Sequence, residues 1–115
     1  MELDFFYLGI IFIIVHELDA MRCREWEIFP ILSKLSENKA RKIFIIAHIP
    51  LFYLLFIQGI KLQNESFQQG FNYFLILHLF AHLLLLKHPQ NAFKDVLSWS
   101  LIVGAALAAV LDLYY

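Results

Sequence analysis

Four long apolar segments constrain the fold of this chain more than any other feature. They cover residues 3–22, 43–60, 71–86 and 93–113, and each approaches the roughly 20 residues that an α-helix needs to cross a bilayer. Hydrophobic residues make up 61% of the chain, well above their share in a soluble domain. The sequence therefore predicts an all-α fold, a polytopic membrane four-helix bundle in one domain over residues 1–115. A very apolar soluble helical bundle is the alternative.

The stretch between the first two segments has a different composition. Residues 24–35 mix charged and aromatic side chains, and Ile28, Leu32 and Leu35 recur at helical spacing. This pattern predicts a short interfacial segment in the headgroup layer. Ser36 is the expected N-cap of the second helix, and Asn91 that of the fourth.

Positive charge is distributed unevenly between the two sides of such a bundle. Only Lys61 lies on the side of the chain termini, and the other eight basic residues lie on the opposite side: Arg22, Arg24, Lys34, Lys39, Arg41, Lys42, Lys87 and Lys94. Loops rich in lysine and arginine stay in the cytoplasm. We therefore expect a multi-pass protein of the inner (cytoplasmic) membrane, with both termini outside and the basic loops cytoplasmic.

Four histidines share one depth in this topology. Each lies five to nine residues from the basic end of its helix, which places it roughly 7 to 14 Å in from the cytoplasmic side: His16, His48, His78 and His82. Asp95 lies on the shallow side of the same layer. Because the histidines lie at one depth on three different helices, we expect the fold to gather them into one cluster near the cytoplasmic leaflet.

The spacing within this cluster favours metal binding. His78 and His82 are four residues apart, so they share a helix face and can present two imidazoles to one ion. His16 and Asp19, three residues apart, can do the same. With His48 added, the set suits a divalent transition metal: Zn, Fe or Mn.

Glu17, next to the first histidine, is the candidate catalytic base or a carboxylate that supports the ligands. If the protein is an enzyme, the depth of the cluster points to a metal-dependent membrane hydrolase or oxidase acting on a lipid-soluble substrate. Two other interpretations stay open. The cluster can be a structural hydrogen-bond network in a non-catalytic accessory protein, or a proton or ion site of a sensor or transporter component.

Several classes of function are disfavoured. A net charge of −1 gives no basic face for nucleic acid, and no nucleotide-binding motif is present. Cys23 is the only cysteine, which excludes a cysteine-based zinc site within one chain. Besides the lipid bilayer, the expected partner is another chain, bound through the small residues Gly104 and Ala108 in a homo- or hetero-oligomer.

One motif resembles a known family. The run His16-Glu17-Leu18-Asp19-Ala20, followed by Glu25-Trp26 and Phe29, looks like an uncharacterised family (a domain of unknown function) of small bacterial four-helix membrane proteins. That resemblance implies these characteristic positions: His16, Glu17, Asp19, Glu25, Trp26, His48 and His78. His82 departs from the expected pattern. The resemblance implies the architecture and the motif but no activity.

Overall fold

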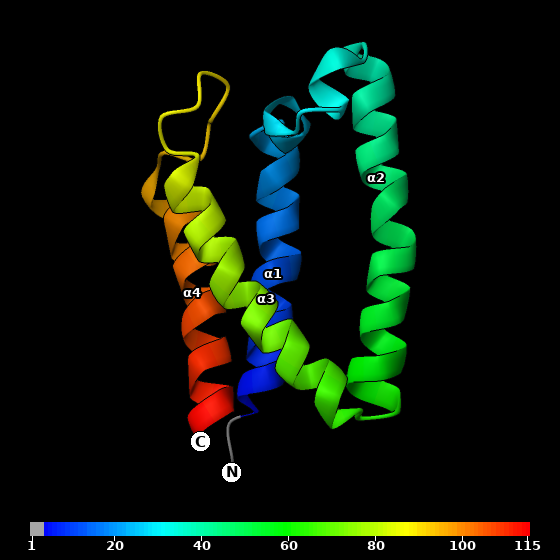
Figure 1. The fold of residues 1–115 in the computed structure, drawn as a ribbon, viewed down its shortest axis with the longest axis vertical. Coiled ribbons are helices and arrows are strands. Elements are labelled where there is room, and N and C mark those ends of the chain that lie inside the picture. Colours follow the sequence, from blue (N-terminus) through cyan, green and yellow to red (C-terminus); the bar gives the residue numbers. More distant parts are fainter. Residues whose placement is uncertain (1–3) are drawn as a thin grey trace.

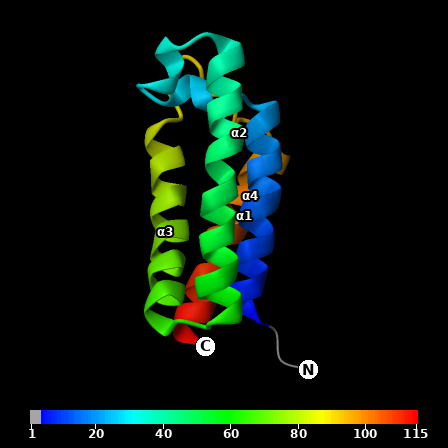
Figure 2. The same ribbon diagram turned by 90° about the vertical axis from the view of Figure 1, so that its right-hand side faces the viewer.

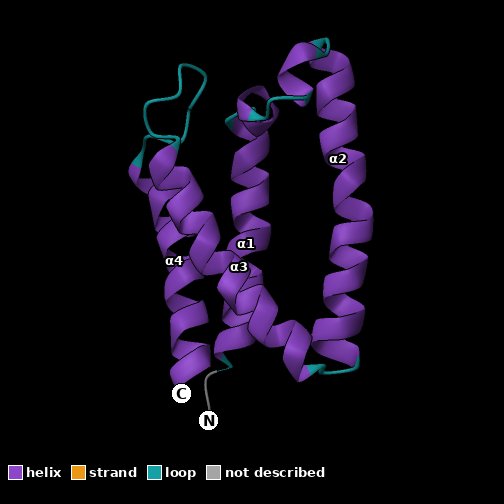
Figure 3. Ribbon diagram, viewed as in Figure 1, coloured by secondary structure: helices purple, strands orange, loops and turns teal. Residues whose placement is uncertain are grey.

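A computed structural model describes residues 4–115, which contain four α-helices and no strand (Figures 1 and 3). The helices are α1 (Phe5–Arg22), α2 (Glu37–Leu54), α3 (Glu65–Leu84) and α4 (Val96–Tyr114). A π-helical segment, η3 (Leu55–Lys61), continues α2, and two 3₁₀ turns, η1 (Glu25–Ile28) and η2 (Leu32–Lys34), connect α1 to α2. The all-α prediction is confirmed. The predicted start of the first segment, Leu3, lies outside the described residues.

Side-chain caps explain where the helices begin. Ser36 accepts a hydrogen bond from the backbone of Lys39, so its predicted N-cap role is confirmed. Asn64 caps α3, which begins six residues before the predicted segment. The predicted cap at Asn91 is wrong, because Asp95 caps α4 through the backbone N–H of Ser98.

The helices pack unequally. α1, α3 and α4 lie against one another, and a core of Ile13, Leu75, Ala105 and Ala109 fills the space between them. The backbone of α2 instead meets η1 and η2 at one end and reaches α3 through η3 at the other (Figures 1 and 2). The middle of α2 therefore stands beside a three-helix unit.

Residues 24–35 close one end of the molecule. Trp26 and Ile28 in η1 are buried, and the ring of Trp26 packs against Phe44 of α2 with 5.6 Å between centroids. Ile31, by contrast, is 78% exposed. The segment packs over the ends of α1 and α2, and its position at a membrane surface stays a prediction.

The small residues of α4 face other helices of the same chain. Ala108 is buried, and a Cβ atom placed on Gly104 would lie 2.7 Å from the ring of Phe12 in α1. These small residues thus allow α4 to pack closely against α1 in the same chain. An oligomer formed through it stays a prediction.

Gly104→Ala is expected to lower the free energy of unfolding by about 1–2 kcal/mol, because the ring of Phe12 must shift to admit a methyl group. Gly70→Ala is the matched control, since a Cβ there meets nothing within 4 Å. The control should raise stability by about 0.5–1 kcal/mol through the helix preference of alanine. Thermal unfolding in detergent measures both variants. Equal shifts of the unfolding midpoint would contradict the close packing of Gly104 against Phe12.

Among residues 4–115, two helical stretches are long and apolar enough to cross a membrane, Glu37–Lys61 and Val96–Tyr114. An 18-residue part of each has a mean hydropathy of 2.1 and 2.0, respectively. Only 17% of that part of the first stretch is buried inside the protein. This is weak evidence for a membrane protein, and it agrees with the sequence interpretation for these two helices.

Candidate metal centre

His16 lies in the last two turns of α1 and is completely buried. Its ring packs edge-on against His78 and His82 of α3, with centroid distances of 4.6 and 5.2 Å. Neither ring nitrogen of His16 has a hydrogen-bond partner among the described residues. A buried polar group without a partner is costly, so the two nitrogens of this imidazole are available to a ligand.

The i,i+4 spacing in α3 brings His78 and His82 together as predicted. Their Nε2 atoms lie 3.2 Å apart, and the two rings are 4.5 Å apart at their centroids. The Nδ1 atom of His78 is also buried without a partner among residues 4–115. Both side chains therefore direct a nitrogen toward the same small volume, next to His16.

Glu25 completes the group from outside the four α-helices. Arg24 adopts a left-handed backbone conformation with φ of 52°, which turns the chain back after α1. The carboxylate of Glu25 then lies 4.0 Å from Nε2 of His16 and 3.8 Å from Nε2 of His82. Burial, and to a lesser extent the charge of Glu17, raises the pKa of Glu25 to about 8.

The four residues offer one ligand atom each, and all four atoms lie within 4.8 Å of one another. A tetrahedral ion with bonds of about 2.0–2.2 Å holds its ligands about 3.3–3.6 Å apart, so small side-chain movements would complete the coordination. The buried ring of Phe93 packs against His16 and His82 at 5.4 and 4.7 Å and shields this side from solvent. The group can therefore hold a metal ion.

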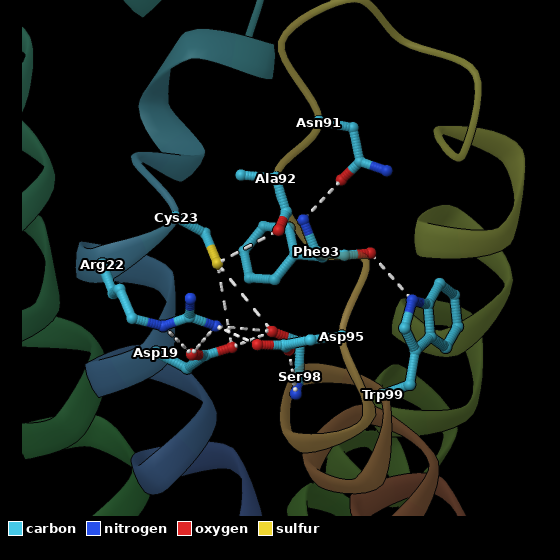
Figure 4. A network of polar contacts seen from close by, with 9 residues as sticks. All are labelled: Asp19, Arg22, Cys23, Asn91, Ala92, Phe93, Asp95, Ser98 and Trp99. Atoms are coloured by element: carbon cyan, nitrogen blue, oxygen red, sulfur yellow. Dashed lines mark hydrogen bonds and ion pairs between the residues drawn. The ribbon is translucent and has the colours of Figure 1, made fainter.

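The structure places Asp19 outside this group. Its Oδ2 accepts a 2.5 Å hydrogen bond from Ser98 of α4, and its Oδ1 accepts a 2.8 Å bond from Arg22 (Figure 4). Arg22 also reaches Asp95 at 3.2 Å. Asp19 and Asp95 thus join the end of α1 to the start of α4, and we call this contact the α1–α4 clamp.

The loop before α4 extends the clamp. Asn91 accepts a hydrogen bond from the backbone N–H of Phe93, and Trp99 donates one to the carbonyl oxygen of Phe93 (Figure 4). The thiol of Cys23 lies within 3.9 Å of Asp19 and 3.8 Å of Ser98. These contacts hold Phe93 in place over the histidines.

His48 is also outside the metal group, because it lies on the helix that stands apart. Its Nε2 atom lies 2.6 Å from Oε2 of Glu17, and its Nδ1 lies 2.6 Å from the carbonyl oxygen of Phe44. A carbonyl only accepts, so Nδ1 donates to Phe44 and fixes the orientation of the ring. Glu17, the candidate base, is therefore engaged with α2.

The predicted positions thus divide into separate places. The cluster takes His16, His78, His82 and Glu25, whereas Trp26 is buried beside it with no hydrogen-bond partner for its indole N–H within the described range. Sequence reasoning did not assign Glu25 to the metal, although the family-like motif had marked it as a characteristic position. It gave Phe93 no part in the site, because the sequence marks this residue only as another apolar side chain.

Fold and cluster together define the class of this protein: it is all-helical and carries a His/Glu group that can hold a metal ion. The chain belongs to a family of unknown function, DUF6713, which it matches over residues 3–115. The expectation of an uncharacterised family is therefore confirmed, while the bacterial origin and the motif stay predictions. No curated protein and no solved structure matches the chain.

Proposed function

We propose that this protein is a membrane metalloprotein that binds one Zn²⁺ ion through His16, Glu25, His78 and His82. The observation that carries the proposal is the completely buried imidazole of His16, whose two nitrogens find no partner in the described part of the chain. A metal ion would satisfy one nitrogen of each histidine at once. Three imidazoles and a carboxylate form a donor set that Zn²⁺ accepts in tetrahedral geometry.

The carboxylate of Glu25 also supports a cation at this place. Its charge would offset part of the charge of the ion in a buried site, where an unpaired charge is costly. A zinc ion with these four ligands would need to accept a fifth ligand to act as a Lewis acid, and in that case metal-assisted hydrolysis is the reaction class. Glu17, which lines a cavity together with Glu25, His78 and His82, remains the candidate base.

The proposed setting is a bilayer crossed by all four helices. Large apolar side chains are exposed on each of them, including Ile11 of α1, Ile46 of α2, Leu77 of α3 and Leu107 of α4. Soluble proteins rarely expose so continuous an apolar surface. The uneven distribution of lysine and arginine supports cytoplasmic basic loops and outside termini in the inner membrane.

Metal analysis tests the proposal. Protein purified in mild detergent from zinc-supplemented cells is expected to hold about one zinc ion per chain by elemental analysis. Dialysis against a strong chelator should remove the ion and lower the thermal unfolding midpoint, because a ligand that binds only the folded state stabilises it. Folded protein that purifies with no divalent metal and takes up none would contradict the proposal and favour a structural polar network.

A further inference from the structure

A cavity of about 370 Å³ lies directly beside the metal group. Glu25, His78 and His82 form part of one wall, and Ala47 and Leu51 of α2 form part of the wall opposite. Apart from Glu17 and His48, the other side chains that line it are apolar. The cluster is therefore covered by Phe93 on one side and faces an apolar cavity on another.

A second cavity of about 380 Å³ continues along α2 toward η3. The two cavities share Glu17, His48, Leu51 and Phe74 in their walls. On α3 their lining residues follow one helix face, at positions 67, 70, 71, 74, 78, 81, 82 and 85. The two cavities lie one after the other over about 27 Å beside α3, with the histidines near one end, and we call the two together the channel.

The separation of α2 from the three-helix unit produces this channel. The hydrogen-bonded pair of Glu17 and His48 joins α1 to α2 and lies in the wall that the two cavities share. Leu51 and Phe74, on opposite walls, are both largely exposed, at 57% and 50%. The channel is thus open laterally, on the side where a bilayer would lie.

We propose that this channel binds an amphiphile with a single acyl chain, whose head-group oxygen reaches the metal as a fifth ligand while the chain lies between α2 and α3. The inference rests on the proposed zinc centre and names its substrate class. One divalent ion with one carboxylate and neutral imidazoles leaves a net positive site, which attracts a carboxylate, ester or hydroxamate oxygen. The apolar walls match an acyl chain and offer few partners for a polar one.

Alkyl hydroxamates test this arrangement, because their heads bind metals and their chains vary in length. The protein is loaded with Co²⁺ in phospholipid nanodiscs, and binding of acetohydroxamate and octanohydroxamate is followed through the visible absorption of the metal. Ala47→Trp narrows the channel. Ile46→Trp, on the neighbouring position outside all described cavity walls, is the matched control and experiences the same partitioning of the probes into lipid.

Ala47→Trp is expected to raise the Kd for octanohydroxamate by about tenfold or more, because the chain loses its place in the channel. The Kd for acetohydroxamate and the cobalt spectrum should not change, and Ile46→Trp should affect neither probe. An unchanged Kd for octanohydroxamate in Ala47→Trp, with the cobalt spectrum intact, would overturn the channel alone. If wild-type protein shows no visible absorption from bound Co²⁺, the proposed zinc centre is wrong, and the proposed position of the head group is wrong with it.

Discussion

His16→Ala is expected to lower zinc affinity by about two to three orders of magnitude, since four ligands share a total of about 10–16 kcal/mol in structural zinc sites. The purified variant should then lose its ion during dialysis at a chelator concentration that leaves the wild-type ion in place. Removing the ring also removes two unpartnered buried nitrogens. Without metal, the variant should therefore lose only the stability that the cavity left by the missing ring costs, relative to metal-free wild type.

The control for this experiment is His48→Ala. His48 is a histidine at similar depth, but its ring contacts Glu17 and Phe44 instead of the cluster. This variant should keep a full equivalent of zinc, whereas His78→Ala and His82→Ala should behave like His16→Ala. Zinc loss in His48→Ala equal to that in His16→Ala would contradict the assignment of ligands.

Asp19→Asn is expected to lower the free energy of unfolding by about 2–3 kcal/mol and to leave the zinc content unchanged. The carboxylate of Asp19 is buried, and it accepts hydrogen bonds from both Ser98 and Arg22. An amide in its place removes the negative charge and directs an N–H group at one of these donors. Thermal unfolding measures the loss of stability, and metal analysis of the same sample shows whether the zinc content has changed.

Asp95→Asn provides the comparison within the same clamp. Asparagine still caps α4, and the ion pair that is lost joins two half-exposed side chains. The expected loss is below about 1 kcal/mol. If Asp19→Asn removed zinc, Asp19 would be a ligand, as its spacing from His16 had indicated. A loss of stability no larger than that of Asp95→Asn would contradict the clamp.

The depth of the histidines was predictable from the sequence, because helical rise converts position along a segment into distance from its end. This calculation placed His16, His78 and His82 at one level, and the structure brings their rings together. It also placed His48 there, yet His48 lies across the channel. Depth along a helix says nothing about the lateral distance between helices. The calculation therefore did not reveal that α2 stands apart from the three-helix unit.

The role of Glu25 depended on a feature that sequence reasoning does not reveal. Arg24 takes a left-handed conformation that non-glycine residues rarely adopt, and the reversed chain direction points Glu25 back toward the end of α1. Asp19 was misleading for a related reason. Residues three apart on a helix differ by about 60° in direction, which is enough for Asp19 to face α4 while His16 faces α3.

The α1–α4 clamp also determines the order in which the site is built. The hydrogen bond from Ser98 to Asp19 joins residues 79 positions apart, so it forms only after nearly the whole chain has been synthesised. Closing so long a loop costs entropy, which the packing of α1 against α4 must recover. All four cluster residues precede Phe93 in the chain. For the proposed zinc ion, this order means that every ligand is synthesised before the residue that covers the site.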